Sequence, residues 1–416
     1  MWSTNERKQD QGDDNSTQRP VKGLLEKRSK GRPLKRWADD IKELAGKDWL
    51  ILSQNRDKWK ELEEAFTRKG TLVHTNEAYK ILVVLPVKVP SQNILCNGYV
   101  DNLLRAGHEV TYITPFPRKE LPPKFRQIVF DYPDNLMPGN ILTIEKILNK
   151  SIDVMDMSLI ISPFLDGVVH CLRDKNVQNL INDPNESFDA VIIEWLMLHV
   201  ISGFAAVFQA PLIWSNPAEA SWLPLSVVDE VPNPAYAPDI LADYFHPYTF
   251  WQRAKQLLKQ ISMPVILYYF NSKTEHHYEE VFVAAGKKKG IALPSMAEVN
   301  YNASFMFSNS HVSLGEPIRL PQNFIPIAGY HIDQKPKPLP EDLQKIMDNA
   351  KHGVIYFSMG SNIQSRFIPE KMKREFLDMF SKFKQTVLWK FEDVLPDLPS
   401  NVHIIKWAPQ HSILGE

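Results

Sequence analysis

The chain has 416 residues, of which 44% are hydrophobic and 11% aromatic, so it can build the cores of two or three domains. Its formal net charge is −1, which excludes a general attraction of the whole chain to nucleic acid or to an anionic membrane. No apolar run reaches the roughly 18 residues of a membrane span, and the first residues are too polar for a secretory signal.

Residues 1–78 differ in composition from the rest of the chain. We expect residues 1–18 to be disordered, because they are almost entirely polar. The stretch Arg19–Arg36 holds eight basic residues and one acidic residue, and two short amphipathic helices are predicted after it. A basic arm before a helical hairpin could contact nucleic acid, but a solvated leader explains it more simply, so nucleic acid is not expected as a partner.

Two motifs in this leader resemble the C-terminal tail of a non-LTR retrotransposon reverse transcriptase. They are Gly31–Lys42 and Asn55–Trp59, and the resemblance covers roughly residues 30–70. We interpret residues 1–78 as transposon-derived sequence joined to an unrelated domain.

From residue 79 the pattern predicts an α/β domain. Ile81–Pro86 is a continuous apolar run, typical of a strand buried on both faces. A loop to Gln92, a helix from Asn93 to Ala106 that packs Ile94, and a strand at Glu109–Thr114 should follow. This βαβ unit indicates a doubly wound parallel sheet. Further strands are expected at Gln127–Phe130, Ala190–Ile193, Pro211–Trp214 and Phe305–Phe307, and helices at Ile141–Met155, Val200–Phe208 and Phe250–Ile261.

Two places in this domain are candidate sites, because ligands of such sheets bind beyond the carboxyl ends of the strands. One is the loop Val87–Gln92. The other is Glu194, which follows an apolar strand directly and is either an exposed strand-end carboxylate or a functional acid or hydrogen-bond partner. His199, at a helix start, is more simply a structural histidine. The two cysteines, Cys96 and Cys171, have no metal-ligand spacing, and we expect two buried thiols.

The proline-rich Lys335–Pro340 predicts a stiff linker, so the first domain should span residues 79–340 and a second should begin at 341. In the second domain, the apolar run Val354–Phe357 breaks into small and polar residues, and Pro369 opens a helix. A strand followed by a tight loop and a helix can bind a phosphate through backbone N–H groups, although the same pattern is also typical of an ordinary turn between a strand and a helix. The helix should bury Met372, Phe376, Met379, Phe380 and Phe383; strands are expected at Thr386–Lys390 and Val402–Trp407, with Trp407 in the core.

Several motifs in residues 79–416 resemble those of the UDP-glycosyltransferase family, most of all its insect members. They are FDAVIIEW at Phe188–Trp195, Asn233–Asp239, NSHVSL at Asn309–Leu314, GVIYFSMGSN at Gly353–Asn362 and WAPQ at Trp407–Gln410. The resemblance implies an α/β, GT-B-like fold, with two Rossmann-like domains of which the first binds the acceptor and the second the UDP-sugar. It also implies inverting transfer of a hexosyl group from a UDP-sugar to a hydroxyl of a small lipophilic acceptor, without a metal or a bound cofactor.

The resemblance also assigns roles to single residues. Gln92 stands at the position of the family's basic histidine, and Glu194 at that of the aspartate beside it. Glutamine cannot take a proton at pH 7, so we expect low or no activity, with His199 the next candidate base. On the donor side, the phosphate-side loop of the family is matched by Ser358, Gly360, Ser361 and Asn362. Trp407 matches the residue that stacks on uracil, and Gln410 matches one that contacts the nucleotide.

The family pattern continues beyond Glu416, so residues 341–416 are expected to form a C-terminally truncated UDP-sugar domain. The family lies in the endoplasmic-reticulum membrane with lumenal catalytic domains; this sequence shows neither signal peptide nor anchor and is expected to be cytosolic as written. An alternative function is a non-catalytic module that binds lipophilic ligands or associates with other glycosyltransferases.

Overall fold

The computed structural model describes residues 78–416 except 134–135, 137–156, 229–231, 240–241, 243, 312, 315–317, 333–335 and 361–363. The leader at residues 1–77, the helix expected at Ile141–Met155, and the site residues Ser361 and Asn362 therefore lie outside the described residues.

Seven parallel strands form the first sheet, in the order β3-β2-β1-β4-β5-β6-β7. Their bounds are β1 Lys80–Val84, β2 Glu109–Thr114, β3 Phe125–Val129, β4 Ala190–Glu194, β5 Leu212–Asn216, β6 Phe305–Ser308 and β7 Phe324–Pro326. The predicted strands are confirmed within one or two residues. Sequence reasoning missed β7, whose three residues are too few to show a pattern.

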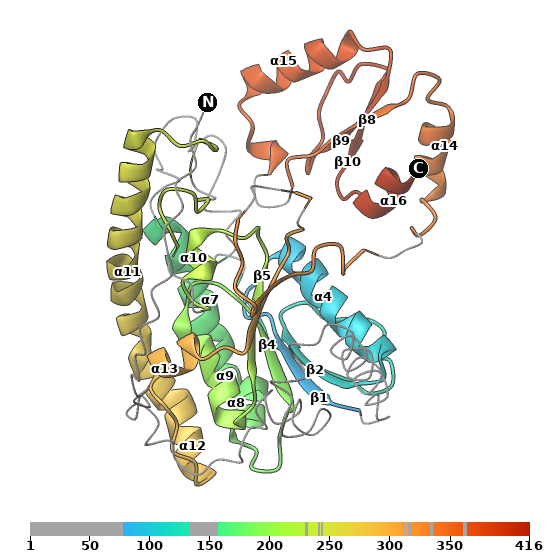
Figure 1. The fold of residues 1–416 in the computed structure, drawn as a ribbon. Coiled ribbons are helices and arrows are strands. Elements are labelled where there is room, and N and C mark those ends of the chain that lie inside the picture. Colours follow the sequence, from blue (N-terminus) through green and yellow to red (C-terminus); the bar gives the residue numbers. More distant parts are fainter. Residues whose placement is uncertain are drawn as a thin grey trace, which may run out of the picture. The chain divides into compact units, whose positions relative to one another are not determined.

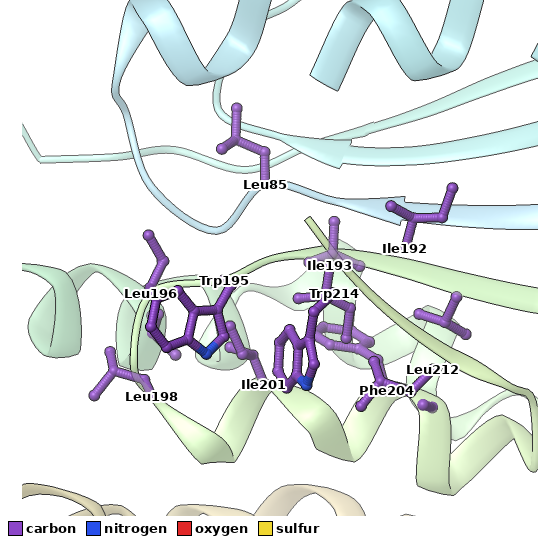
Figure 2. Close-up of a cluster of buried hydrophobic side chains, with 14 of the residues drawn as sticks. Leu85, Ile192, Ile193, Trp195, Leu196, Leu198, Ile201, Phe204, Leu212 and Trp214 are labelled. Atoms are coloured by element: carbon purple, nitrogen blue, oxygen red, sulfur yellow. The ribbon is translucent and has the colours of Figure 1, made fainter. Parts of the chain in front are cut away.

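Helices cover both faces of this sheet. Figure 2 shows β1 and β4 between two helical layers, α4 on one side and α9 on the other. The helical elements are α4 Pro90–Arg105, α7 Met157–Arg173, α8 Lys175–Asn182, η2 His199–Ser202, α9 Gly203–Phe208, α10 Trp222–Leu225, α11 Phe250–Tyr278, η3 Glu279–Val283, α12 Ala284–Lys288 and α13 Met296–Tyr301 (Figure 1). The core holds Leu85, Ile193 and Trp214, all fully buried, so the apolar runs of these strands are buried on both faces as predicted.

Two helix predictions need correction. Helix α4 begins at Pro90 rather than Asn93, because the fixed φ of proline suits a first helical turn, and Gln92 therefore lies in the helix rather than in a loop. Ile94, expected to pack, is 49% exposed, since the buried face of α4 runs through Leu95, Tyr99 and Val100. Helix α11 does not stop at Ile261 but continues past Pro264 to Tyr278.

Three parallel strands form the second sheet, in the order β10-β9-β8. The elements are α14 Glu341–Asp348, β8 Val354–Phe357, η4 Ser365–Phe367, α15 Glu370–Ser381, β9 Thr386–Lys390, β10 Val402–Ile405 and α16 Gln410–Gly415 (Figure 1). A core around Phe380, Val387 and Trp389 holds this sheet to α15.

Pro369 opens α15 as predicted, as its N-cap residue. Two other predictions in this part were wrong. Met379, expected in the core, is 41% exposed, because Phe376 and Phe380 define the buried face and Met379 lies beside it. Strand β10 ends at Ile405, so Trp407 follows it and is 61% exposed instead of buried.

The described residues contain two free cysteines, Cys96 and Cys171, both buried as predicted. We find in the described part of the chain no helix whose length and hydropathy would let it span a bilayer.

Candidate active site

The first candidate site lies at the carboxyl ends of β1 and β4. The two strands are parallel neighbours, with Val84 in register with Ile193. Strand β1 leads through a short loop into α4, whose third residue is Gln92, and β4 ends with Glu194. Because chain order reverses between β1 and β4, this is the switch point at which doubly wound sheets bind their ligands. The structure thus brings both predicted residues to one edge of the sheet.

Glu194 is buried, with 1% of its surface exposed, so the alternative of an exposed strand-end carboxylate is wrong. Its Oε2 accepts hydrogen bonds from Ser215 Oγ at 2.7 Å and from Cys96 Sγ at 3.8 Å. Within the described part of the chain, its Oε1 has no partner. Burial raises the pKa of Glu194 to about 8, so at pH 7 the carboxyl group is mostly protonated and can donate a hydrogen bond.

Gln92 lies on the same helix as Cys96, which donates to Glu194. It lies four residues, or one helical turn, before Cys96, so the two side chains share a face of α4. Its Oε1 is buried and, like Oε1 of Glu194, lacks a hydrogen-bond partner among the described residues. A buried amide oxygen that accepts and a protonated carboxyl that donates are complementary to a hydroxyl group, which does both. This pair can hold an alcohol or a phenol.

His199 has a different environment. It begins η2, its backbone N–H donates to Asn271 Oδ1 at 2.8 Å, and its ring meets Tyr301 edge-on at 5.6 Å between centroids. Burial lowers the pKa of His199 to about 4, so the ring is neutral at pH 7. These contacts with α11 and α13 fit the structural histidine expected from the sequence.

The donor-side candidates lie at the carboxyl ends of β8 and β10, on either side of β9. Ser358 and Gly360 follow β8, and Gly360 has a φ of +81°, which favours glycine. Its N–H donates to Ser358 Oγ at 3.3 Å. Gln410 begins α16, and Tyr356 Oη donates to its Oε1 at 3.3 Å, so the ends of β8 and β10 are connected. Trp407 lies in the chain between β10 and Gln410, and its ring is exposed rather than packed in the core.

Sequence reasoning missed Lys390, the last residue of β9. Its side chain is 8% exposed, its Nζ donates to Gly360 O at 2.9 Å, and it forms an ion pair with Glu392. Glu392 in turn accepts from Arg366 N at 3.0 Å. Lys390 therefore holds Gly360 directly and is linked to Arg366 through Glu392. A charged residue at the end of an otherwise apolar strand was the available signal, for Lys390 as for Glu194.

Comparison with known proteins identifies the family. The family model "UDP-glucoronosyl and UDP-glucosyl transferase" matches residues 80–416. The chain belongs to this family. Its members include UDP-glucosyltransferase 2 of Dactylopius coccus, 31% identical over 350 residues that cover 83% of this chain and 65% of that protein. Another relative, the ecdysteroid UDP-glucosyltransferase of Spodoptera littoralis nuclear polyhedrosis virus, is 22% identical over 82% of this chain and 69% of its own length.

The chain spans about 65% of the length of its first insect relatives. Among solved structures, the calicheamicin glycosyltransferase CalG4 superposes over 81% of this chain and 73% of its own, with a TM-score of 0.43 and 16% identity. Arabidopsis thaliana UGT89C1 in complex with UDP gives a TM-score of 0.44, 14% identity and the same two coverages. These scores are below 0.5, so the α/β, GT-B-like fold class rests on the family and on the chain's own parallel sheets, which confirm the prediction.

Proposed function

We propose that this protein transfers a hexosyl group from a UDP-sugar to a hydroxyl of a small lipophilic acceptor. The observation that carries the proposal is the family match over residues 80–416, which takes in both sheets and both candidate sites. UDP-glucose is the first candidate donor, since two relatives are named as UDP-glucosyltransferases. The ecdysteroid enzyme among them favours a steroid or phenolic acceptor.

On the donor side, the loop Ser358–Asn362 would bind the diphosphate through backbone N–H groups, with Ser361 and Asn362 in their family roles. Trp407 would stack on uracil and Gln410 contact the nucleotide. Hydrogen bonds aimed at the departing diphosphate stabilise its charge in the transition state, so this chemistry requires no metal. In this proposal, the boundary after residue 78 separates the leader from the acceptor-side domain, and the boundary after residue 340 separates that domain from the donor-side domain.

On the acceptor side, Gln92 would orient the hydroxyl and Glu194 would take its proton. The hydroxyl oxygen forms a bond to the anomeric carbon, the bond from that carbon to UDP breaks, and UDP leaves with the electron pair. Gln92 cannot act as the base. The carboxylate form of Glu194 can, but its pKa of about 8 makes that form scarce at pH 7. We therefore expect a slow reaction that accelerates as the pH rises toward 8.

A second candidate function is acceptor binding without transfer, alone or in association with another glycosyltransferase. The specific observation in its favour is Gln92, which keeps the hydrogen-bonding capacity of the site without its basicity. Binding of UDP-sugar and acceptor would then occur without product.

The experiment measures release of UDP from UDP-glucose with a panel of steroids and phenols, beside calorimetric titration with UDP. Gln92→His should raise the rate by about 10²–10⁴-fold if it supplies the missing base. Ser91→His, on the neighbouring exposed residue, is the matched control and should leave the rate unchanged. Failure to bind UDP in every variant would contradict the proposal, whereas binding without transfer would favour the second candidate.

For location, we propose the lumen of the endoplasmic reticulum, where the family acts. Three Asn-x-Ser acceptor sequences begin at Asn149, Asn185 and Asn302; Asn185 and Asn302 are exposed, and Asn149 lies outside the described residues. In secretory expression, a glycosidase-sensitive mass that Asn185→Gln and Asn302→Gln each reduce would support this location, and an unmodified protein would contradict it.

A further inference from the structure

Helix α11 exposes apolar residues along the side that faces away from the core. Its buried side is marked by Gln256, Met263 and Thr274. At 100° per residue, Val265 lies directly opposite Gln256, and it is 67% exposed. We call the apolar residues on this side the outer face of α11: Phe250, Trp251, Leu257, Leu258, Ile261, Val265, Tyr268 and Tyr269, all exposed. A contiguous apolar surface of this kind marks an interaction site.

The charges on α11 are all of one sign over most of its length. Residues 250–274 contain Arg253, Lys255, Lys259 and Lys273 and no acidic residue, in a chain whose net charge is −1. Lys259 is paired with Asp239. Lys255 and Lys273 are 18 residues, or five turns, apart, and so flank the outer face on the same side. Both are exposed. The surface that covers this face should therefore be negative.

Aromatic residues stand at both ends of the outer face, Phe250 and Trp251 at one and Tyr268 and Tyr269 at the other. Aromatic rings favour the boundary between lipid headgroups and acyl chains, and a basic amphipathic helix binds that boundary lengthwise. We propose that α11, the long helix at the left of Figure 1, lies along an anionic lipid surface with its outer face in the headgroup boundary and its basic residues at the phosphates.

A second copy of the chain fits this helix less well. A two-fold dimer would place the same surface against itself, and the basic residues of one α11 would meet those of the other without an acidic partner. The inference concerns the lipid contact of the acceptor-side domain and does not depend on sugar transfer.

The test is co-sedimentation of the full chain with vesicles of phosphatidylcholine containing phosphatidylserine. The double variant Leu258→Ser/Val265→Ser should reduce vesicle affinity at least about tenfold, since it removes two apolar side chains that the headgroup boundary would bury. The matched control Leu314→Ser/Val394→Ser changes equally exposed residues elsewhere, 66% and 76%, and should bind as the wild type does. The basic stretch Arg19–Arg36 is present in every variant, so its own attraction to the vesicles is constant.

Charge reversal provides the second arm. The vesicle affinity contributed by the outer face is the part that Leu258→Ser/Val265→Ser removes. In Lys255→Glu/Lys273→Glu, this part should no longer be larger for vesicles with phosphatidylserine than for vesicles of pure phosphatidylcholine. Equal vesicle binding by the wild type and the outer-face variant would overturn the proposal. So would a dimer in sedimentation velocity that the outer-face variant dissociates while vesicle binding stays unchanged.

Discussion

The hydroxyl of Ser215 donates a 2.7 Å hydrogen bond to Glu194 inside the first sheet, where the two residues are register partners on β5 and β4. Both side chains are buried, with 1% of each residue exposed. The neighbouring strand thus holds one carboxyl oxygen, and the other has no hydrogen-bond partner among the described residues. This arrangement explains how a carboxyl group can be placed at the switch point in a fixed orientation and mostly neutral.

Removal of this donor should destabilise the fold. In Ser215→Ala, Oε2 of Glu194 keeps only the weak Cys96 Sγ–H donor, and we expect a loss of about 1–3 kcal/mol in the free energy of unfolding. Ser272→Ala is the control, because Ser272 is exposed and bonds only within α11. Urea denaturation measures both. Equal stability of the two variants would show that the buried hydrogen bond contributes little.

Stability should depend on pH through Glu194. Its pKa is about 8 in the folded chain and near 4.5 in the unfolded chain, so between these pH values the folded state keeps a proton that the unfolded state releases. The contribution of the neutral carboxyl is complete below pH 4.5 and is lost as the pH rises to 8, by a few kcal/mol in total.

Glu194→Gln keeps the shape of the side chain and removes its titration. Unfolding free energies measured between pH 5 and 8 should therefore fall more steeply for the wild type than for this variant. Parallel curves would mean that Glu194 is already ionised in the folded protein.

The sequence was sufficient for all the described strands except β7, because apolar runs are local signals. It was also sufficient for the edge on which Gln92 and Glu194 lie, because parallel strands of one sheet end at the same edge. It was not sufficient for their surroundings. The burial of Glu194 depends on Ser215 and Cys96, which are distant in the chain and become neighbours only through strand order and the seating of α4. Trp407 was wrongly predicted in the opposite direction. It was expected in the core as the last residue of a strand, but the strand ends two residues earlier and the side chain is exposed.

Lys390 should stabilise the loop that follows β8. Lys390→Met removes the donor to Gly360 O and the partner of Glu392, a carboxylate that is 17% exposed, and should cost about 2–3 kcal/mol of unfolding free energy. Lys382→Met breaks the exposed pair with Asp378 and should cost less than about 1 kcal/mol. Chemical denaturation compares them. If both variants lose the same small amount, Lys390 does not hold the loop.

Trp407 should contribute to nucleotide binding and not to the fold. Its side chain is 61% exposed, so Trp407→Ala should leave the unfolding free energy within about 0.5 kcal/mol of the wild type. Loss of a stacked base is worth about 1–3 kcal/mol, which corresponds to about 5- to 150-fold in the dissociation constant for UDP. Trp251→Ala removes a tryptophan that is 79% exposed on α11 and should leave UDP affinity unchanged. Calorimetric titration with UDP separates the two, and an equal effect of both substitutions would remove Trp407 from the donor site.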